Sequence, residues 1–216
     1  MARCSSAILP ILVLMGCLFT DAADARNRLS QDSDPLVPIA ESSPILAPFQ
    51  HVRFCLRYPS DCKSDPSESE RIDLNDETSR LLDRVNRDVN AAITPTIKGY
   101  GSDLKDRWTI SPVIGDCNDY AVTKRHELLQ NGLPAKALRL SVVKTASGIG
   151  HLVLVVATTK GELVLDNLTG TIRPWQNTDY HWLKIQSATD ARLWNEIKPA
   201  SPSVSQSRTA IRLADR

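Results

Sequence analysis

The chain has 216 residues, 42% of them hydrophobic, which is enough for one domain with a substantial core. Lys and Arg number 26 against 25 Asp and Glu, so no basic excess is left to bind nucleic acid, and we expect no nucleic-acid partner.

The first 25 residues have the features of a secretory signal peptide. Arg3 is the only charged residue before an apolar run from Ala7 to Phe19, and a small-x-small cleavage site follows at residues 23–25. The run is short for a membrane span. Leu14–Cys17 also resembles a bacterial lipoprotein box, although the bulky residues after the cysteine disfavour lipidation there. Both interpretations export the protein, so we expect a periplasmic or secreted location.

Export determines how the cysteines are interpreted. Once residues 1–25 are removed, Cys55, Cys62 and Cys117 remain. An odd number in an oxidising compartment leaves one thiol unpaired or joined to another chain. Cys55 and Cys62 flank Pro59 in a turn-rich stretch that could close a small loop. We therefore expect a Cys55–Cys62 disulfide and a free Cys117.

Composition divides the rest of the chain into three parts. Residues 26–48 are polar and interrupted by prolines, with no helical or strand period, and predict an extended lead-in. Residues 49–195 predict one domain. Residues 196–216 are rich in serine and broken by prolines, which is typical of a flexible tail.

A first helix is predicted after residue 75. Asp76 and Glu77 favour its N-terminus, and Thr94–Pro95 ends it. Its apolar residues recur at helical spacing: Leu81, Leu82, Val85, Val89, Ala92 and Ile93.

A second helix is predicted from Cys117 to the stop signal Asn131–Gly132. Cys117 shares a helix face with Ala121 and Leu128, so its thiol is expected to point toward the core. Residues 97–114, between the two helices, predict irregular structure.

Strand patterns follow the helices. Apolar residues alternate around residues 138–142, a fuller apolar run covers His151–Ala157, and a third segment covers Glu162–Asp166. Residues 158–161 suit a four-residue hairpin loop with Gly161 in the left-handed region. Helices followed by consecutive strands predict an α+β fold with an antiparallel sheet.

The hairpin predicts which polar side chains meet. If Ala157 pairs with Glu162, Asp166 lies opposite Val153, and His151 becomes its diagonal neighbour on the same face. Diagonal neighbours are close enough for an imidazole to meet a carboxylate. A three-residue loop would instead place the two on opposite faces.

Together with Cys117, this pair forms a candidate catalytic triad. A thiol is a strong nucleophile as thiolate, which a helix N-terminus and an imidazolium favour. His151 would move the proton, and Asp166 would fix the orientation of the imidazole. Backbone N–H groups at the helix start could hold the oxyanion.

Each of these residues also has a structural interpretation. A cysteine at a helix start is often a small core residue, and a histidine or aspartate at a strand end often has a structural role. His126 lies on the opposite face of its helix from Cys117 and cannot be the base, and His51 and His181 are expected to be structural. No close Cys/His pair with ligand spacing is apparent, which disfavours zinc.

The stretches "GDCNDYAVTKRHELLQNGLP", "LRLSVV" and "GHLVLVVATTKGELVLDNL", together with the earlier "HVRFCLRYPSDC", resemble the bacterial transglutaminase-like cysteine proteinases. The resemblance covers roughly residues 48–185. It implies a papain-like, transglutaminase-like fold with N-terminal helices packed on an antiparallel sheet. It also implies that Cys117, His151 and Asp166 are nucleophile, base and orienting acid.

The resemblance implies an exported cysteine peptidase that acts on a protein. One periplasmic branch of the family cleaves surface adhesins under the control of a membrane protein, so a cell-surface substrate and a membrane-anchored regulator are expected. A transglutaminase-type acyl transferase would use the same triad. A catalytically silent binding module on the same scaffold is a third alternative, which the intact triad disfavours.

The chemistry requires no cofactor, but the resemblance raises the possibility of calcium. Acidic residues beside the family's nucleophile bind calcium, which implies Asp116, Asn118 and Asp119 as ligands here. Family members commonly carry Glu where this chain has Asn118, and a small residue where it has Leu152. The lost charge predicts weak or absent calcium binding. Alternatively, Asp116 simply favours the positive end of its helix.

Overall fold

The computed structural model describes residues 38–96 and 107–198 of the chain. All of them belong to one compact unit, Leu36–Arg216. The predicted signal peptide, most of the predicted lead-in and most of the predicted tail lie outside the described residues. Within the described part of the chain, no helix is both long and apolar enough to span a membrane.

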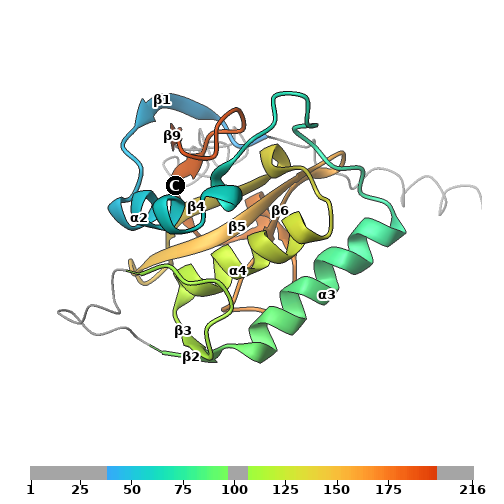
Figure 1. Ribbon diagram of the computed structural model, residues 1–216, viewed down its shortest axis with the longest axis vertical. Helices are drawn as coiled ribbons and strands as arrows, with labels where there is room; N and C mark the ends of the chain where they lie inside the picture. Colours follow the sequence, from blue (N-terminus) through green and yellow to red (C-terminus); the bar gives the residue numbers. More distant parts are fainter. Residues whose placement is uncertain (1–37, 97–106, 199–216) are drawn as a thin grey trace, which may run out of the picture. The chain divides into compact units, whose positions relative to one another are not determined.

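The centre of the fold is a seven-stranded antiparallel sheet in the order β1-β9-β8-β4-β5-β6-β7. Figure 1 labels β1, β9, β4, β5 and β6 of this sheet. Its strands are β1 Glu41–Ile45, β4 Leu138–Lys144, β5 Gly150–Thr158, β6 Gly161–Leu165, β7 Arg173–Pro174, β8 His181–Gln186 and β9 Trp194–Ile197. A separate parallel pair joins β2 Thr94–Pro95 to β3 Ile114–Gly115.

Helices cover one face of this sheet. They are α2 Phe49–Arg57, α3 Asp76–Ala92 and α4 Cys117–Gln130, and short 3₁₀ turns occur at η1 Pro59–Cys62, η2 Ala135–Ala137 and η3 Trp175–Asn177. Helix α4 packs on β4 and β5, and α3 packs on α4 (Figure 1). The predicted α+β class, with helices on an antiparallel sheet, is confirmed.

Both predicted helices are present with the expected end signals. The Asn75 side chain accepts hydrogen bonds from the backbone N–H groups of Glu77 and Thr78, which caps α3. Helix α3 ends at Ala92, with Ile93 as its C-cap just before the Thr-Pro pair. Helix α4 begins at Cys117, and Gly132 follows its end with a φ of 81°, a conformation that favours glycine.

The predicted hairpin register is also present. Ala157 pairs with Glu162, as expected, but pairing continues to Thr158 and Gly161, so the loop contains only two unpaired residues instead of four. The Thr158 hydroxyl tightens this turn because it donates to the Gly161 carbonyl at 2.7 Å and accepts from the Lys160 N–H at 3.0 Å. Gly161 has a φ of 97°, as its predicted left-handed position requires.

The domain begins earlier than predicted. Strand β1 lies inside the predicted lead-in and pairs with β9, so the boundary at residue 49 is too late. The carboxylate of Glu41 holds this edge because it accepts hydrogen bonds from Arg139 and Asn195. Such a short strand, broken by Pro44, leaves little periodic signal. Helix α2, β8 and β9 were likewise not predicted.

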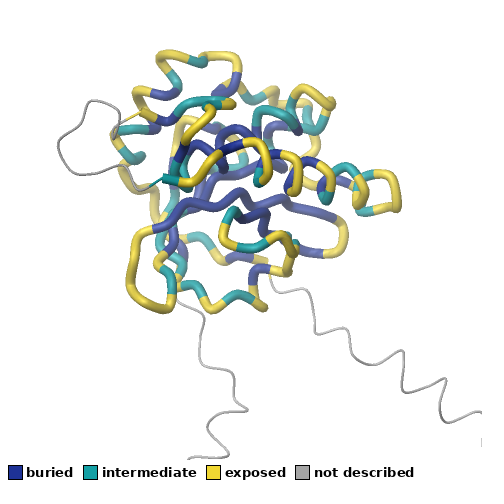
Figure 2. Tube along the Cα trace, turned by 90° about the horizontal axis from the view of Figure 1, so that it is seen from below, coloured by how far each residue is buried: buried dark blue, intermediate teal, exposed yellow. Residues whose placement is uncertain are grey.

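Apolar packing occurs on both faces of the sheet. Leu140, Leu154 and Val156 belong to the cluster shared with the helices, whereas Val153 and Val155 belong to a second cluster on the other face. Strand β5 is buried along its whole length after Gly150. Figure 2 shows these buried segments gathered at the centre, with exposed turns around them.

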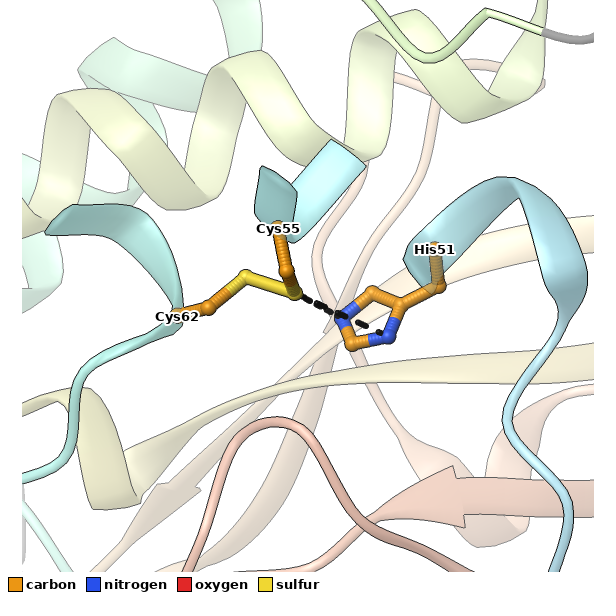
Figure 3. Close-up of side chains that lie close together, drawn as sticks. All are labelled: His51, Cys55 and Cys62. Atoms are coloured by element: carbon orange, nitrogen blue, oxygen red, sulfur yellow. Dashed lines mark hydrogen bonds between the residues drawn. A yellow bond between two sulfur atoms is a disulfide. The ribbon is translucent and has the colours of Figure 1, made fainter. Parts of the chain in front are cut away.

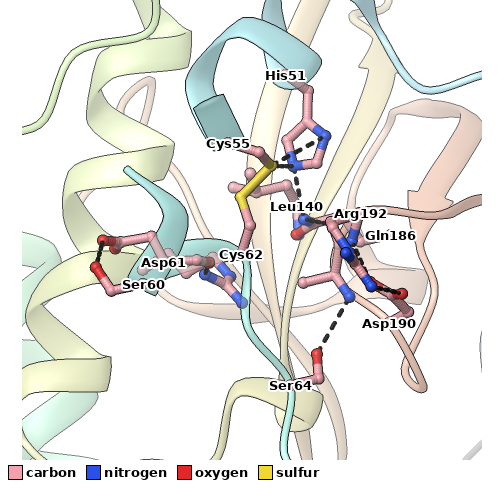
Figure 4. Close-up of a disulfide and its surroundings, with 12 residues drawn as sticks. His51, Cys55, Ser60, Asp61, Cys62, Ser64, Leu140, Gln186, Asp190 and Arg192 are labelled. Carbon is pink, nitrogen blue, oxygen red and sulfur yellow. Dashed lines mark hydrogen bonds and ion pairs between the residues drawn. A yellow bond between two sulfur atoms is a disulfide. The ribbon is translucent and has the colours of Figure 1, made fainter. Parts of the chain in front are cut away.

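A disulfide, drawn in Figure 4, and a buried arginine fasten η1 to the rest of the domain. Cys55 of α2 is joined to Cys62 of η1, the pairing expected from the sequence, and Cys117 is a free cysteine. The Arg125 guanidinium of α4 donates to the carbonyl oxygens of Leu138 and Asp61. These bonds hold α4, η1 and β4 together.

We predict that the Cys55→Ala/Cys62→Ala double variant unfolds in urea with about 2–3 kcal/mol less stability than the unmodified protein, because a closed loop of this length restricts the unfolded chain. Intact mass after alkylation without reductant should show one adduct on the mature, unmodified protein. Three adducts, or equal unfolding free energies, would contradict this assignment.

Candidate active site

Cys117 is the first residue of α4, and the side chains of Asp116 and Asp119 cap the start of the helix around it. The Asp116 carboxylate accepts from the N–H groups of Asn118 and Asp119, at 3.0 and 3.4 Å. Asp119 Oδ2 in turn accepts from the Asp116 N–H at 3.0 Å. This capping box fixes the backbone on both sides of the half-buried Cys117.

Gly115 is needed for this arrangement. A Cβ atom at this position would lie 2.8 Å from Asp119 Oδ2 and 3.0 Å from Ile93 Cγ2. Asp119 cannot easily move aside, because its carboxylate is buried and its Oδ1 also accepts from the Thr109 N–H at 2.8 Å. The Gly-Asp-Cys sequence therefore has a steric cause as well as a chemical one.

His151 and Asp166 stand at the same end of the β5–β6 hairpin, opposite its turn. Their side chains meet with His151 Nε2 2.8 Å from Asp166 Oδ1, and both residues are buried. This is the diagonal contact that the hairpin register predicted. The Leu168 N–H donates to the same carboxylate oxygen at 3.0 Å.

The ring of His151 lies between Asp166 and Cys117. Because Nε2 faces the carboxylate, Nδ1 is left as the ring nitrogen for the thiol. Burial by itself would lower the pKa of His151, but hydrogen bonds to Asp166 and Cys117, and their negative charges, raise it to about 9. The imidazole is therefore protonated at neutral pH.

Asp166 is the negatively charged partner of the His151 imidazolium. Burial alone would raise the pKa of its carboxyl group, but the hydrogen bond and charge of His151, together with hydrogen bonds from Tyr180 and Leu168, lower it overall. The site thus contains a carboxylate, an imidazolium and a sulfur in sequence, which is the charge arrangement of an activated thiol.

The start of α4 also offers a donor for an oxyanion. The N–H groups of Asn118 and Asp119 are taken by the Asp116 cap. The N–H of Cys117 has no hydrogen-bond partner among the residues that the structure describes. The sequence analysis expected several backbone N–H groups at this helix start to be able to hold the oxyanion. Of the first three N–H groups of α4, only that of Cys117 is left by the cap.

Two residues of the site were missed in the sequence. The Tyr180 hydroxyl donates to Asp166 Oδ2, and its ring centroid lies 5.7 Å from that of His151. The Asn90 amide of α3 donates to the backbone oxygen of Asp166 at 2.9 Å. Neither residue belongs to a local motif, because each reaches Asp166 only through the tertiary fold.

The other histidines lie away from this triad. His126 pairs with Asp61, with 2.9 Å between Nδ1 and Oδ1, and His181 is exposed. His51 forms, with Cys55 and Cys62, the only cluster of three possible metal-binding residues in the described ranges (Figure 3). The four-residue spacing of His51 and Cys55 on α2 was overlooked in the sequence.

The chemistry of this cluster does not fit a metal. Both sulfurs belong to the disulfide and offer no thiolate. Nδ1 of His51 already accepts from the Trp194 indole N–H at 3.2 Å. Burial, helped by the charge of Arg125, lowers the pKa of His51 to about 4, so the ring stays neutral inside the core.

The carboxylates beside Cys117 fit calcium only as a weak site. Both oxygens of Asp119, and Oδ1 of Asp116, already accept backbone N–H groups. Carboxylate oxygens keep further lone pairs, and Asn118 adds a neutral carbonyl. The donor set has two anions and no third carboxylate within ligand distance in the described part of the chain.

Comparison with known proteins gives one family and a set of structures. The family model described as bacterial transglutaminase-like cysteine proteinase matches residues 41–201. Calcium-bound LapG of Legionella pneumophila is 20% identical, with a TM-score of 0.48 over 77% of this chain and 90% of that one. Another LapG structure from this organism is 21% identical, with a TM-score of 0.45 over 76% and 85%. A search of the curated proteins finds no match.

We predict that His151→Ala slows the alkylation of Cys117 by iodoacetamide at neutral pH, because the neighbouring imidazolium that favours a thiolate is lost. His181→Ala is the control and should react at the rate of the unmodified protein. Equal rates for the unmodified protein and His151→Ala would rule out the ion pair.

Proposed function

Because the chain belongs to the bacterial transglutaminase-like cysteine proteinases, we propose that it cleaves a peptide bond with Cys117, His151 and Asp166 as its catalytic triad. The observation that carries this proposal is the position of His151, which is hydrogen-bonded to Asp166 and whose pKa is raised by both Asp166 and Cys117. The capped start of α4 supports it by fixing the thiol beside the imidazole.

The first half of the reaction forms a thioester. The thiolate sulfur of Cys117 attacks the peptide carbonyl carbon, and the Cys117 N–H stabilises the oxygen as it becomes negative. The His151 imidazolium then gives its proton to the leaving amine nitrogen as the C–N bond breaks. Asp166 keeps the ring oriented throughout and does not take the proton.

The second half releases the acid. Neutral His151 accepts a proton from water, whose oxygen attacks the thioester carbonyl carbon. Collapse of this intermediate breaks the C–S bond and expels the Cys117 thiolate, which is again paired with the imidazolium formed when water attacked. If a primary amine replaced water in this step, the same residues would perform acyl transfer.

The cellular setting of this reaction is also a proposal. The apolar run of residues 7–19 and the cleavage signal at residues 23–25 support export to the periplasm or beyond. The family resemblance supports a cell-surface protein as substrate and a membrane-anchored protein as regulator.

Calcium would bind weakly beside the nucleophile. Asp116, Asn118 and Asp119 would hold the ion, which would add positive charge near the start of α4 and fix the segment before it. The Asn118 side chain supplies an oxygen but no charge, which limits the affinity.

We predict that Cys117→Ala and His151→Ala abolish cleavage of a protein substrate while the fold is retained. Asp166→Asn should lower kcat/KM on the order of 10²–10⁴-fold, because the orienting charge is lost while the shape is kept. His181→Ala, on an exposed strand residue, is the matched control.

The substrate for this assay can be found by mass spectrometry of exported proteins from cells with the unmodified protein and with Cys117→Ala. Incubation with a labelled primary amine then separates hydrolysis from acyl transfer. Cleavage that persists in Cys117→Ala would refute the proposed function.

For calcium, we predict weak or undetectable binding to the unmodified protein by calorimetry, with stronger binding in Asn118→Glu and none in Asp116→Ala. Because Asp116 also caps α4, its variant is first compared with the unmodified protein by thermal unfolding. Tight binding that neither substitution changes would place calcium elsewhere.

A further inference from the structure

Lys124 of α4 is a buried cation that no hydrogen bond compensates. Its side chain is only 1% exposed, and its Nζ atom has no hydrogen-bond partner among the described residues. An ammonium group in such a place opposes folding, because it loses its hydration without a direct replacement. Stability therefore does not explain this lysine.

The position of Lys124 relates it to the triad. It follows Cys117 by seven residues, so the two occupy nearly the same side of α4, two turns apart. Burial is the larger influence on Lys124 and lowers its pKa to about 7, whereas attraction to Asp166 acts in the opposite direction. Asp166 is therefore the acidic group whose negative charge attracts the Lys124 ammonium.

A set of buried amides complements this ammonium. The side-chain oxygens of Asn86, Asn90 and Asn167 are buried without a hydrogen-bond partner in the described residues. The amide nitrogens of Asn90 and Asn86 already hold the segment after β6, because they donate to the backbone oxygens of Asp166 at 2.9 Å and Gly170 at 3.1 Å. The amide oxygens of Asn86 and Asn90 remain as unused acceptors on α3, the helix that packs on the α4 of Lys124.

We propose that Lys124 is a positioning residue of the active site, whose ammonium is the internal counter-charge of Asp166 and, with the amides of Asn86 and Asn90, anchors the segment that carries it. Because neither the ammonium nor these amide oxygens have a direct partner within the described ranges, buried water would bridge them. This inference rests on the proposed function, since it gives Lys124 a role in orienting His151 through Asp166.

Arg125 provides a matched control. It is the next residue of α4 and is also buried, at 2% exposure. Its guanidinium, however, bonds the carbonyl oxygens of Leu138 and Asp61, and its charge interacts with Asp61 and Glu68. Loss of Arg125 removes a buried cation of the same helix without touching Asp166.

The first test measures the coupling by NMR, independently of peptidase activity. The Lys124 side-chain resonances of the mature protein should titrate at a pH about one unit lower or more in Asp166→Asn than in the unmodified protein, because the attracting carboxylate is gone. An unchanged titration would overturn the proposal. This test also decides the matter if Lys124→Met does not fold.

The second test measures the consequence for the triad. In Lys124→Met, the side-chain carboxyl carbon of Asp166 should titrate by NMR at a pH higher by about one unit or more than in the unmodified protein, because the attracting ammonium is gone. In Arg125→Met the Asp166 titration should stay in place, even if the stability of the protein falls. An unchanged Asp166 titration in Lys124→Met, or an equal shift in both variants, would overturn the proposal. A confirmed coupling together with an active Cys117→Ala would instead refute the proposed function alone.

Discussion

The contact between the His151 imidazole and the Asp166 carboxylate, 2.8 Å long, is the interaction on which the site depends. It exists only because the β5–β6 turn sets one register, since a slip of one residue would turn Asp166 to the other face of the sheet. Once this pair is fixed, the capped start of α4 needs only to present Cys117 to the remaining ring nitrogen. Tyr180 then holds the second oxygen of the carboxylate, and Asn90, from an element far away in sequence, holds the backbone oxygen of Asp166.

Apolar burial stabilises this domain, and polar contacts determine how its elements are oriented. The two clusters on the faces of the sheet supply the hydrophobic driving force, which is not directional. Direction comes from buried polar groups that cost free energy unless they are paired. Arg125 ties α4 to η1 and β4, and Asp119 ties the start of α4 to Asp116 and Thr109. The catalytic geometry thus results from satisfying polar groups that a purely apolar core would not contain.

Local patterns in the sequence predicted the parts of the fold that depend on local chemistry. The limits of α3 and α4 follow from their caps and stop signals, and the β5–β6 register follows from Gly161 and the strand period. Strands β1, β8 and β9 were missed because they are defined by their partners across the sheet. For the same reason the sequence placed Cys117, His151 and Asp166 together but could not identify Tyr180, whose only link to them is a side-chain contact.

The central claim is that His151 carries a proton between Asp166 and Cys117 at neutral pH, and NMR titration of its ring tests this most directly. The chain has four histidines, so the resonance can be assigned by substitution. The account predicts that the His151 ring titrates near pH 9 in the unmodified protein and at lower pH in Asp166→Asn. Titration near the ordinary histidine value of about 6.5, equal in both proteins, would contradict it.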